Sequence, residues 1–213
     1  MEQLIWYKYK VKEPLNWVGH LAIMRVFERA WRRSGLPVSY SKGFNPRIKQ
    51  SFGLPLVVGA TSDCEYGDIR FNQWVNVRDV QEKLAAAIHP AIEILKVILA
   101  PTLNTSLMQS VRYADYQLKV ADDAGLGEAI DHFNTQSKVM MVKKTKHHNK
   151  EIDAKSLVRQ LSLISERTLS MRLQSGEQGT LKPLELLRCL NPALEPVRLH
   201  RLAALDSRET ELF

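Results

Sequence analysis

Hydrophobic and polar positions alternate over residues 4–11, where aromatic and aliphatic side chains are interleaved with lysines. This period of two predicts a half-buried strand whose lysine side chains point outward. Residues 17–34 follow a helical period instead, which predicts a helix with Asn16 as its N-cap and Gly35 as its C-terminal stop. The apolar side of this helix carries His20, Met24, Phe27 and Trp31.

The rest of the first half predicts further short elements between glycine- and proline-containing turns. We expect strands at residues 38–41, 66–72 and 92–99, a helix at 77–88, a loop at 42–53 and a turn at 59–64. The resulting β-α-β-β-α-β order is that of a ferredoxin-like fold, in which two helices cover one face of an antiparallel sheet.

The second half is predicted to repeat this order, although the two halves share no obvious sequence identity. The expected strands are residues 116–120, 139–144, 161–164 with 169–173, and 197–205, and the expected helices are residues 126–133 and 183–190. A stretch rich in Thr, Ser and Asn at residues 101–111 separates the halves. The sequence therefore predicts an α+β protein of two tandem ferredoxin-like (βαββαβ) domains with antiparallel sheets, residues 1–105 and 106–213.

The composition is that of a globular chain, with 45% hydrophobic and 25% charged residues over 213 positions. No apolar run reaches the roughly 18 residues needed to cross a bilayer, and the first residues do not form a leader pattern, so we expect a cytoplasmic protein. Cys64 and Cys189 lack CxxC spacing, which excludes a cysteine-based disulfide framework, zinc site or iron–sulfur cluster. The adjacent His147 and His148 lie among lysines that disfavour a cation, so no metal site is predicted.

The net charge of +7 is concentrated in two places. Residues 25–49 hold seven lysines and arginines against one acid, Glu28, and residues 138–150 hold five lysines, two histidines and no acid. In the first block Arg25, Arg29 and Arg32 are spaced i, i+4 and i+7 along the predicted helix and form a cationic stripe. The stripe has two interpretations, an anion-binding surface or a solvated helix face partly neutralised by Glu28.

The predicted loop after this helix favours the anion-binding interpretation. Gly43 can take a positive φ and Pro46 restricts its own φ and that of Asn45, so the loop can hold a defined shape. Phe44 either stacks on a base or plugs the core together with Phe52. The candidate RNA- or anion-binding residues are Arg25, Arg29, Arg32, Arg33, Lys42, Phe44, Asn45, Arg47, Lys49, Lys143, Lys144 and Lys146.

Catalytic residues are harder to assign. His20 and Tyr40 are candidates for proton transfer, although a histidine on the apolar side of a helix is more often a hydrogen-bonded core residue. Asp63, Glu65 and Asp68 are expected to cap or solvate a turn. No GxGxxG, P-loop, HExxH or GxSxG motif is present, so the sequence predicts none of the mechanisms that depend on them.

A long signature covers residues 20–21, 24–25, 27–30, 32–38, 40–47 and 51–52, and looser matches follow at 65–68, 110–116, 143–153 and 181–183. These stretches resemble the bacterial radical-SAM-linked protein family, a domain of unknown function encoded next to, or fused behind, a cobalamin-binding radical SAM protein. The chain departs from the family pattern at Ile48, at Gln50 and in its lysine block. The resemblance implies a radical SAM partner that carries SAM, a 4Fe-4S cluster and cobalamin. The chain itself has no CxxxCxxC, so we expect no cofactor in it.

These residues and the resemblance are compatible with three functions. The leading hypothesis is a noncatalytic RNA-binding accessory protein that works with a radical SAM enzyme in RNA modification or maturation. The second is a metal-independent RNA-processing enzyme, because tandem ferredoxin-like domains with basic loops also resemble CRISPR repeat-RNA processing proteins. The third is a subunit whose basic surface docks on an acidic protein, without RNA.

Overall fold

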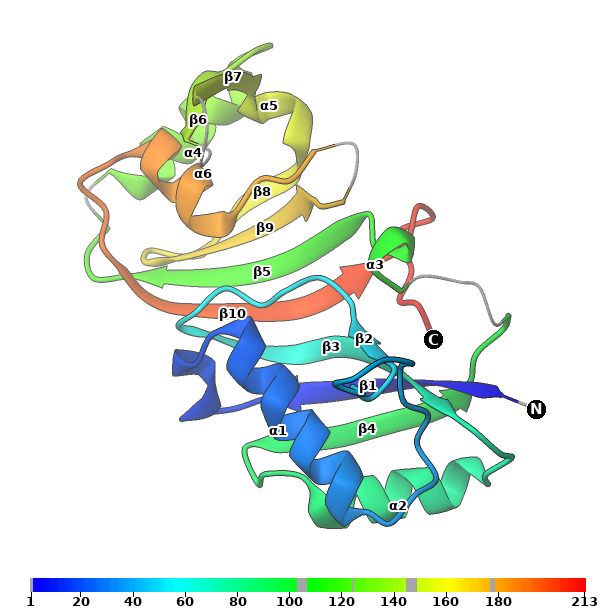
Figure 1. Cartoon of the computed structure of the whole chain (residues 1–213). Coiled ribbons are helices and arrows are strands. Elements are labelled where there is room, and N and C mark those ends of the chain that lie inside the picture. The colour runs from blue at the N-terminus through cyan, green and yellow to red at the C-terminus, as the bar shows by residue number, and fades with distance from the viewer. Residues whose placement is uncertain (1, 103–106, 124, 145–148, 177–178) are drawn as a thin grey trace. The chain divides into compact units, whose positions relative to one another are not determined.

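The computed structural model describes residues 2–102, 107–123, 125–144, 149–176 and 179–213 (Figure 1). The chain forms two compact units, Met1–Val111 and Arg112–Phe213. Both units combine helices with antiparallel sheet, which confirms the predicted α+β class. Within the described residues, no helix is long and apolar enough to cross a membrane.

The first unit is a four-stranded antiparallel sheet with two main helices. Its elements are β1 (Gln3–Val11), a 3-10 turn η1 (Leu15–Trp17), α1 (His20–Arg33), β2 (Gln50–Phe52), β3 (Ala60–Phe71), α2 (Val77–Ala87), β4 (Ile92–Leu99) and α3 (Leu107–Ser110). The strands pair in the order β4-β1-β3-β2. The predicted strand at residues 38–41 is reduced to two isolated bridges, Val38 with Phe71 and Tyr40 with Ile48.

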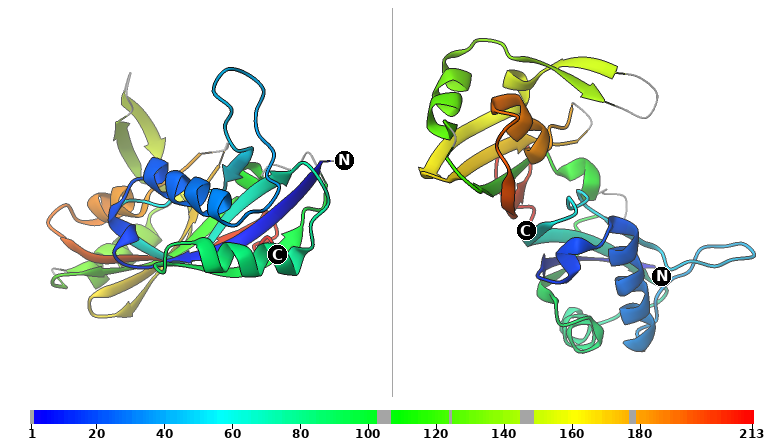
Figure 2. Two further views of the ribbon diagram at one scale, coloured as in Figure 1. Left: turned by 60° about the horizontal axis from the view of Figure 1, so that its bottom comes forward. Right: turned by 90° about the vertical axis from the view of Figure 1, so that its left-hand side faces the viewer.

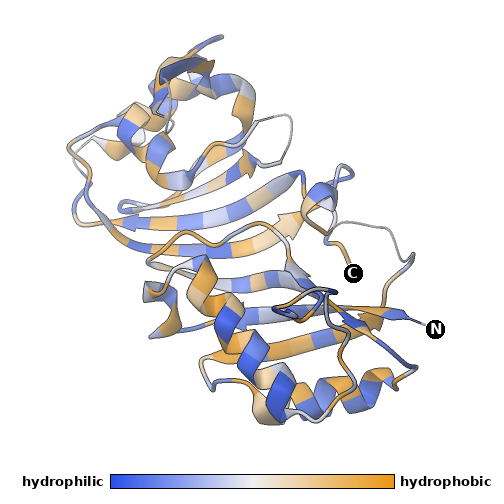
Figure 3. Cartoon of the chain, viewed as in Figure 1, coloured by the Kyte–Doolittle hydropathy of each residue, from blue (hydrophilic) through white to orange (hydrophobic). Residues whose placement is uncertain are grey.

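The core of this unit lies between the sheet and the helices α1 and α2 (Figure 1). Tyr7 of β1 is fully buried, and its ring centroid lies 5.3 Å from that of Phe27 and 5.5 Å from that of Trp31, both on α1. The period of α1 places Phe27 and Trp31 on the buried side, as the sequence predicted. Figure 3 shows hydrophilic and hydrophobic residues alternating along this amphipathic helix.

Two local predictions for this unit are wrong. Asn16 is not the N-cap of α1, because the helix begins after Gly19, whose extended backbone (φ −72°, ψ 161°) occupies that position. Of the turn predicted at residues 59–64, residues 60–64 are part of β3, which pairs with the end of β1 through Glu65 opposite Tyr9 and Ser62 opposite Val11. Gly35 ends the helical region with a φ of 67°, as predicted.

The second unit holds a four-stranded sheet and a separate hairpin. Its elements are β5 (Tyr113–Val120), α4 (Leu126–Thr135), β6 (Met140–Lys144), β7 (Asn149–Asp153), α5 (Ala154–Leu157), β8 (Val158–Ser165), β9 (Thr168–Gln174), α6 (Pro183–Leu190) and β10 (Pro196–Leu205). The main sheet has the antiparallel order β10-β5-β9-β8. In the described part of the chain, β6 pairs with β7 alone, in a second sheet. The sequence did not predict β7, because its charged residues show no alternating apolar pattern.

Candidate anion-binding site

Residues 39–49, here called the 39–49 hairpin, project from the first unit (Figure 2). Backbone hydrogen bonds join its two legs: Ser41 N donates to Arg47 O at 2.8 Å and Lys49 N donates to Ser39 O at 2.8 Å. Its base is fastened to β3, because Ser39 N donates to the carbonyl of Arg70 and Arg70 N donates to that of Lys49. The hairpin is therefore an ordered arm and not the simple loop that the sequence predicted.

The tip of the hairpin turns at Gly43, whose φ of 123° is readily adopted only by glycine. Phe44 follows and is fully exposed, whereas Phe52 on β2 is buried in the core. The alternative in which both phenylalanines plug the core thus holds for Phe52 and is wrong for Phe44. Lys42 and Asn45 are also exposed on the tip.

An open groove of about 580 Å³ lies between α1 and the 39–49 hairpin. Its walls are Leu21, Met24, Arg25, Glu28, Arg32, Asn45, Pro46 and Arg47. Three arginines and one glutamate line it, so its electrostatic potential favours an anion. The groove combines the predicted arginine stripe of α1 with the predicted residues of the loop.

The arginines of the α1 stripe and Arg47 are available for a ligand. Arg25, Arg29, Arg32 and Arg47 are exposed, and within the described residues their side chains make neither a hydrogen bond nor an ion pair. Arg29 lies on the same stripe but does not line the groove wall. Guanidinium groups in this state can donate two hydrogen bonds each to phosphate or carboxylate oxygens without first breaking an internal pair.

Two of the predicted cations are engaged within the protein. Lys49 Nζ lies 2.6 Å from Glu2 Oε1, and this contact lowers the pKa of Glu2. Arg33 Nη2 donates to the carbonyl of Ala87 at 2.6 Å, at the end of α2. Neither side chain lines the groove, and each would have to exchange its partner to bind a ligand.

The second basic block contributes little that the structure can place. Lys143 Nζ donates to the carbonyl of Thr180 and lies 3.6 Å from Glu185 Oε2. The side chain of Lys144 and all of Lys146 fall outside the described residues. Among the residues that are described, no group of histidine, cysteine, aspartate and glutamate could hold a metal ion.

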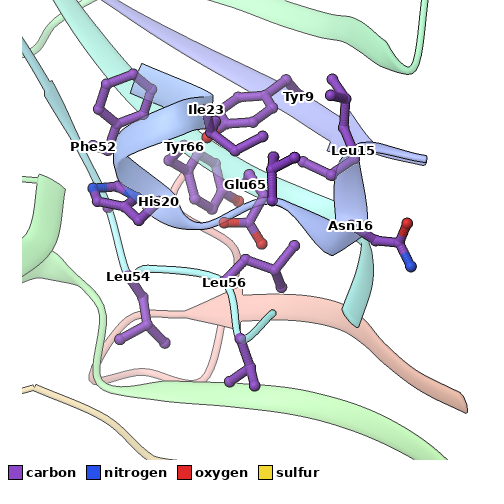
Figure 4. Close-up of a pocket in the computed structure, with 14 residues that line it drawn as sticks. Tyr9, Leu15, Asn16, His20, Ile23, Phe52, Leu54, Leu56, Glu65 and Tyr66 are labelled. Carbon is purple, nitrogen blue, oxygen red and sulfur yellow. The ribbon is translucent and has the colours of Figure 1, made fainter. Parts of the chain in front are cut away.

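His20, at the start of α1, lines a cavity of about 20 Å³, which has room for about one water molecule (Figure 4). Its ring packs edge-on against Phe52 with centroids 5.6 Å apart, and burial lowers the pKa of the imidazole. Glu65, which is buried, and Tyr66 belong to the same wall. Tyr40 does not, so this cavity does not bring the two predicted proton-transfer residues together.

Asp68 is a buried carboxyl on β3, within the strand predicted at residues 66–72, and it does not cap or solvate a turn. It accepts a hydrogen bond from Ser51 Oγ on the neighbouring β2, and burial raises its pKa above 3.8. Because the folded state favours the neutral carboxyl, the stability that this group contributes is largest at low pH and is lost as the pH rises through the raised pKa.

Asp68→Asn is therefore expected to increase the free energy of unfolding above about pH 4 and to leave it nearly unchanged at lower pH. Urea unfolding followed by circular dichroism between roughly pH 3 and pH 7 measures the difference. Asp131→Asn, at an exposed position on α4, is the control. A variant that is less stable than the wild type at neutral pH would contradict the prediction.

Comparison with known proteins places the chain in a family. Residues 5–183 match the family described as "Uncharacterized protein conserved in bacteria (DUF2344)". That match covers α1, the 39–49 hairpin and most of the second unit. A search of curated proteins finds no match to the chain. The protein therefore belongs to the uncharacterized bacterial family DUF2344.

Proposed function

We propose that this protein is an RNA-binding accessory protein. The observation that carries the proposal is the groove between α1 and the 39–49 hairpin. Arg25, Arg32 and Arg47 line it, and their side chains have no hydrogen-bond or ion-pair partner among the described residues. A polyanion with regularly spaced phosphates would engage several of these guanidinium groups at once. The exposed ring of Phe44, which precedes the groove residue Asn45 in the chain, adds a surface on which a base can stack.

We also infer that each unit is a ferredoxin-like domain. The sheet order β4-β1-β3-β2 of the first unit and β10-β5-β9-β8 of the second both place the first and third strands of a βαββαβ unit at the centre. In the second unit, β6, β7 and α5 are then an insertion between the first helix and the second strand. This topology supports the predicted tandem arrangement.

The proposal includes a radical SAM protein as the enzyme that this chain serves, in the cytoplasm. Its support is the resemblance of the α1 and 39–49 hairpin residues to radical-SAM-linked proteins. The partner would supply SAM, a 4Fe-4S cluster and cobalamin, since this chain has only Cys64 and Cys189. RNA modification or maturation is the process that such a pair would perform.

RNA processing by the chain itself is the second hypothesis. Its support is the lowered pKa of His20, because a neutral imidazole can accept a proton near pH 7. The cavity around His20 is too small for a nucleotide in this conformation, which favours the accessory role. Docking of an acidic protein on the same arginines is the third hypothesis.

The test is the affinity of the full chain for a fluorescein-labelled single-stranded RNA, measured by anisotropy over a range of salt concentrations. Three phosphate contacts predict a slope of about −2 for log K against log salt. The same RNA is then examined on a gel. Intact RNA with this slope supports the accessory role, whereas cleaved RNA favours the processing enzyme. An absence of binding at low salt would contradict both and leave the protein-docking hypothesis.

A further inference from the structure

The β6–β7 hairpin of the second unit leaves one strand edge beside a groove. Two adjoining cavities, of about 500 and 280 Å³, lie along β6 and share Cys189 of α6. Their walls are Met141, Val142, Lys143, Glu185, Arg188 and Cys189 in one, and Ala129, His132, Phe133, Gln136, Lys138, Val139, Cys189 and Leu190 in the other. No residue of β7 belongs to either wall.

The way β6 lines this groove identifies which side of the strand faces it. Met141, Val142 and Lys143 are consecutive, and all three belong to the wall. Successive side chains of a strand point to opposite faces, so three neighbours share a wall only when the edge of the strand borders it. The edge of β6 that lies away from β7 therefore faces α6.

The register of the hairpin shows which backbone groups point to that edge. Ala154 N donates to Val139 O at 2.8 Å, so residues 139 and 154 occupy a hydrogen-bonded position of the ladder, although Val139 N donates to Asp153 Oδ1. In an antiparallel ladder such pairs alternate, which places the next ones at Met141 with Ile152 and at Lys143 with Lys150. The amide and carbonyl groups of Met140 and Val142 consequently point away from β7, toward the open edge.

The side chains around the edge define the chemistry of an occupant. The side chains of Met140 and Val142 are 51% and 54% exposed. So much exposed apolar surface is unusual for an edge strand. Met141, Phe133 and Leu190 add apolar surface inside the groove. Lys138 and Arg188 are exposed on its walls, and within the described residues neither has an ion-pair partner.

We propose that this groove binds an extended, acidic segment of a partner protein, which adds to β6 as a third strand. Backbone hydrogen bonds from Met140 and Val142 would hold the segment, and its alternating side chains would meet the apolar floor and the cations Lys138 and Arg188. RNA fits less well, because the floor is apolar and the edge offers peptide hydrogen bonds. A second copy fits less well too, because β6 carries no acid to oppose its own lysines.

Val142→Pro is the decisive substitution, because it removes one outward amide without touching the pairing with β7. Val142→Thr keeps that amide and is the matched control. The probe is a short fluorescein-labelled peptide of alternating valine and glutamate, with a valine–lysine peptide as the charge-reversed control. We expect the acidic peptide alone to bind, Val142→Thr to retain its affinity and Val142→Pro to weaken it about tenfold.

Hydrogen exchange on the wild-type chain gives an independent readout, in case the proline variant disturbs the hairpin. The acidic peptide should slow exchange of the Met140 and Val142 amides. Equal binding of the lysine peptide, slower exchange of the Met140 and Val142 amides with an RNA oligonucleotide than with the acidic peptide, self-association through β6 in light scattering, or unchanged exchange at these amides with the acidic peptide would each overturn the proposal. The RNA groove of the first unit is not involved in any of these outcomes.

Discussion

A Gly67→Ala variant is expected to lose roughly 3 kcal/mol of stability or to fail to fold. Gly67 lies on β3 directly opposite Tyr7 of β1, and an added Cβ would overlap the Tyr7 ring at Cζ, Oη and Cε2. The ring cannot move aside easily, because it is fully buried against Phe27 and Trp31. The φ of Gly67 is not positive, so the effect arises from overlap alone and not from backbone strain.

Urea unfolding followed by circular dichroism measures this loss. Gly53→Ala is the matched control, because its added Cβ would make an ordinary contact of 3.5 Å with Tyr66 Cβ. A smaller residue at position 7 should relieve the overlap, so Tyr7→Leu combined with Gly67→Ala should be less destabilised than the two single changes summed. If the free energy of unfolding of Gly67→Ala lies within about 0.5 kcal/mol of the wild-type value, the packing described for this core is incorrect.

Replacing Arg25, Arg32 and Arg47 together by alanine is expected to weaken RNA binding roughly 100-fold, taking about 1 kcal/mol for each lost contact. The dependence of affinity on salt should almost disappear, because the groove would no longer release counterions from the RNA. All three side chains are exposed and unpaired among the described residues, so the free energy of unfolding should change little. Fluorescence anisotropy across salt concentrations measures both quantities.

Two further variants separate the groove from overall charge. Arg78→Ala, Lys83→Ala and Lys119→Ala together remove three exposed cations that do not line the groove, and should change affinity much less. Glu28→Gln removes the groove's acid and should strengthen binding. Equal losses in the two triple variants would mean that net charge, and not this groove, attracts the RNA.

Several features follow from the sequence because they depend on near neighbours. The i, i+4, i+7 spacing of Arg25, Arg29 and Arg32 determines that they share a helix face, since the geometry of an α-helix repeats over a few residues. The helix Pro183–Leu190 was predicted with the same bounds as in the structure, because its apolar period and its first-turn proline are both local signals.

Pairing between residues that lie far apart in the chain cannot be predicted from local sequence patterns. Residues 59–64 were assigned to a turn, yet residues 60–64 belong to a strand because β1 supplies backbone partners more than fifty positions away in the chain. Lys49 was predicted as a ligand-binding cation, but Glu2 lies beside it only once the 39–49 hairpin has folded. Strand pairing and ion pairs of this kind carry no periodic signal in a single sequence.

By itself, the sequence determined that this protein has an amphipathic helix with a cationic stripe followed by a basic, glycine-containing segment. Only the tertiary structure decided which cations are available. Backbone pairing turns residues 39–49 into an arm that brings Arg47 to the same groove as Arg25 and Arg32, and leaves Phe44 exposed at its tip. The physical reason is that helix periodicity is a local property. A groove requires two segments at a fixed distance, and here the hairpin is held in place by its hydrogen bonds to β3.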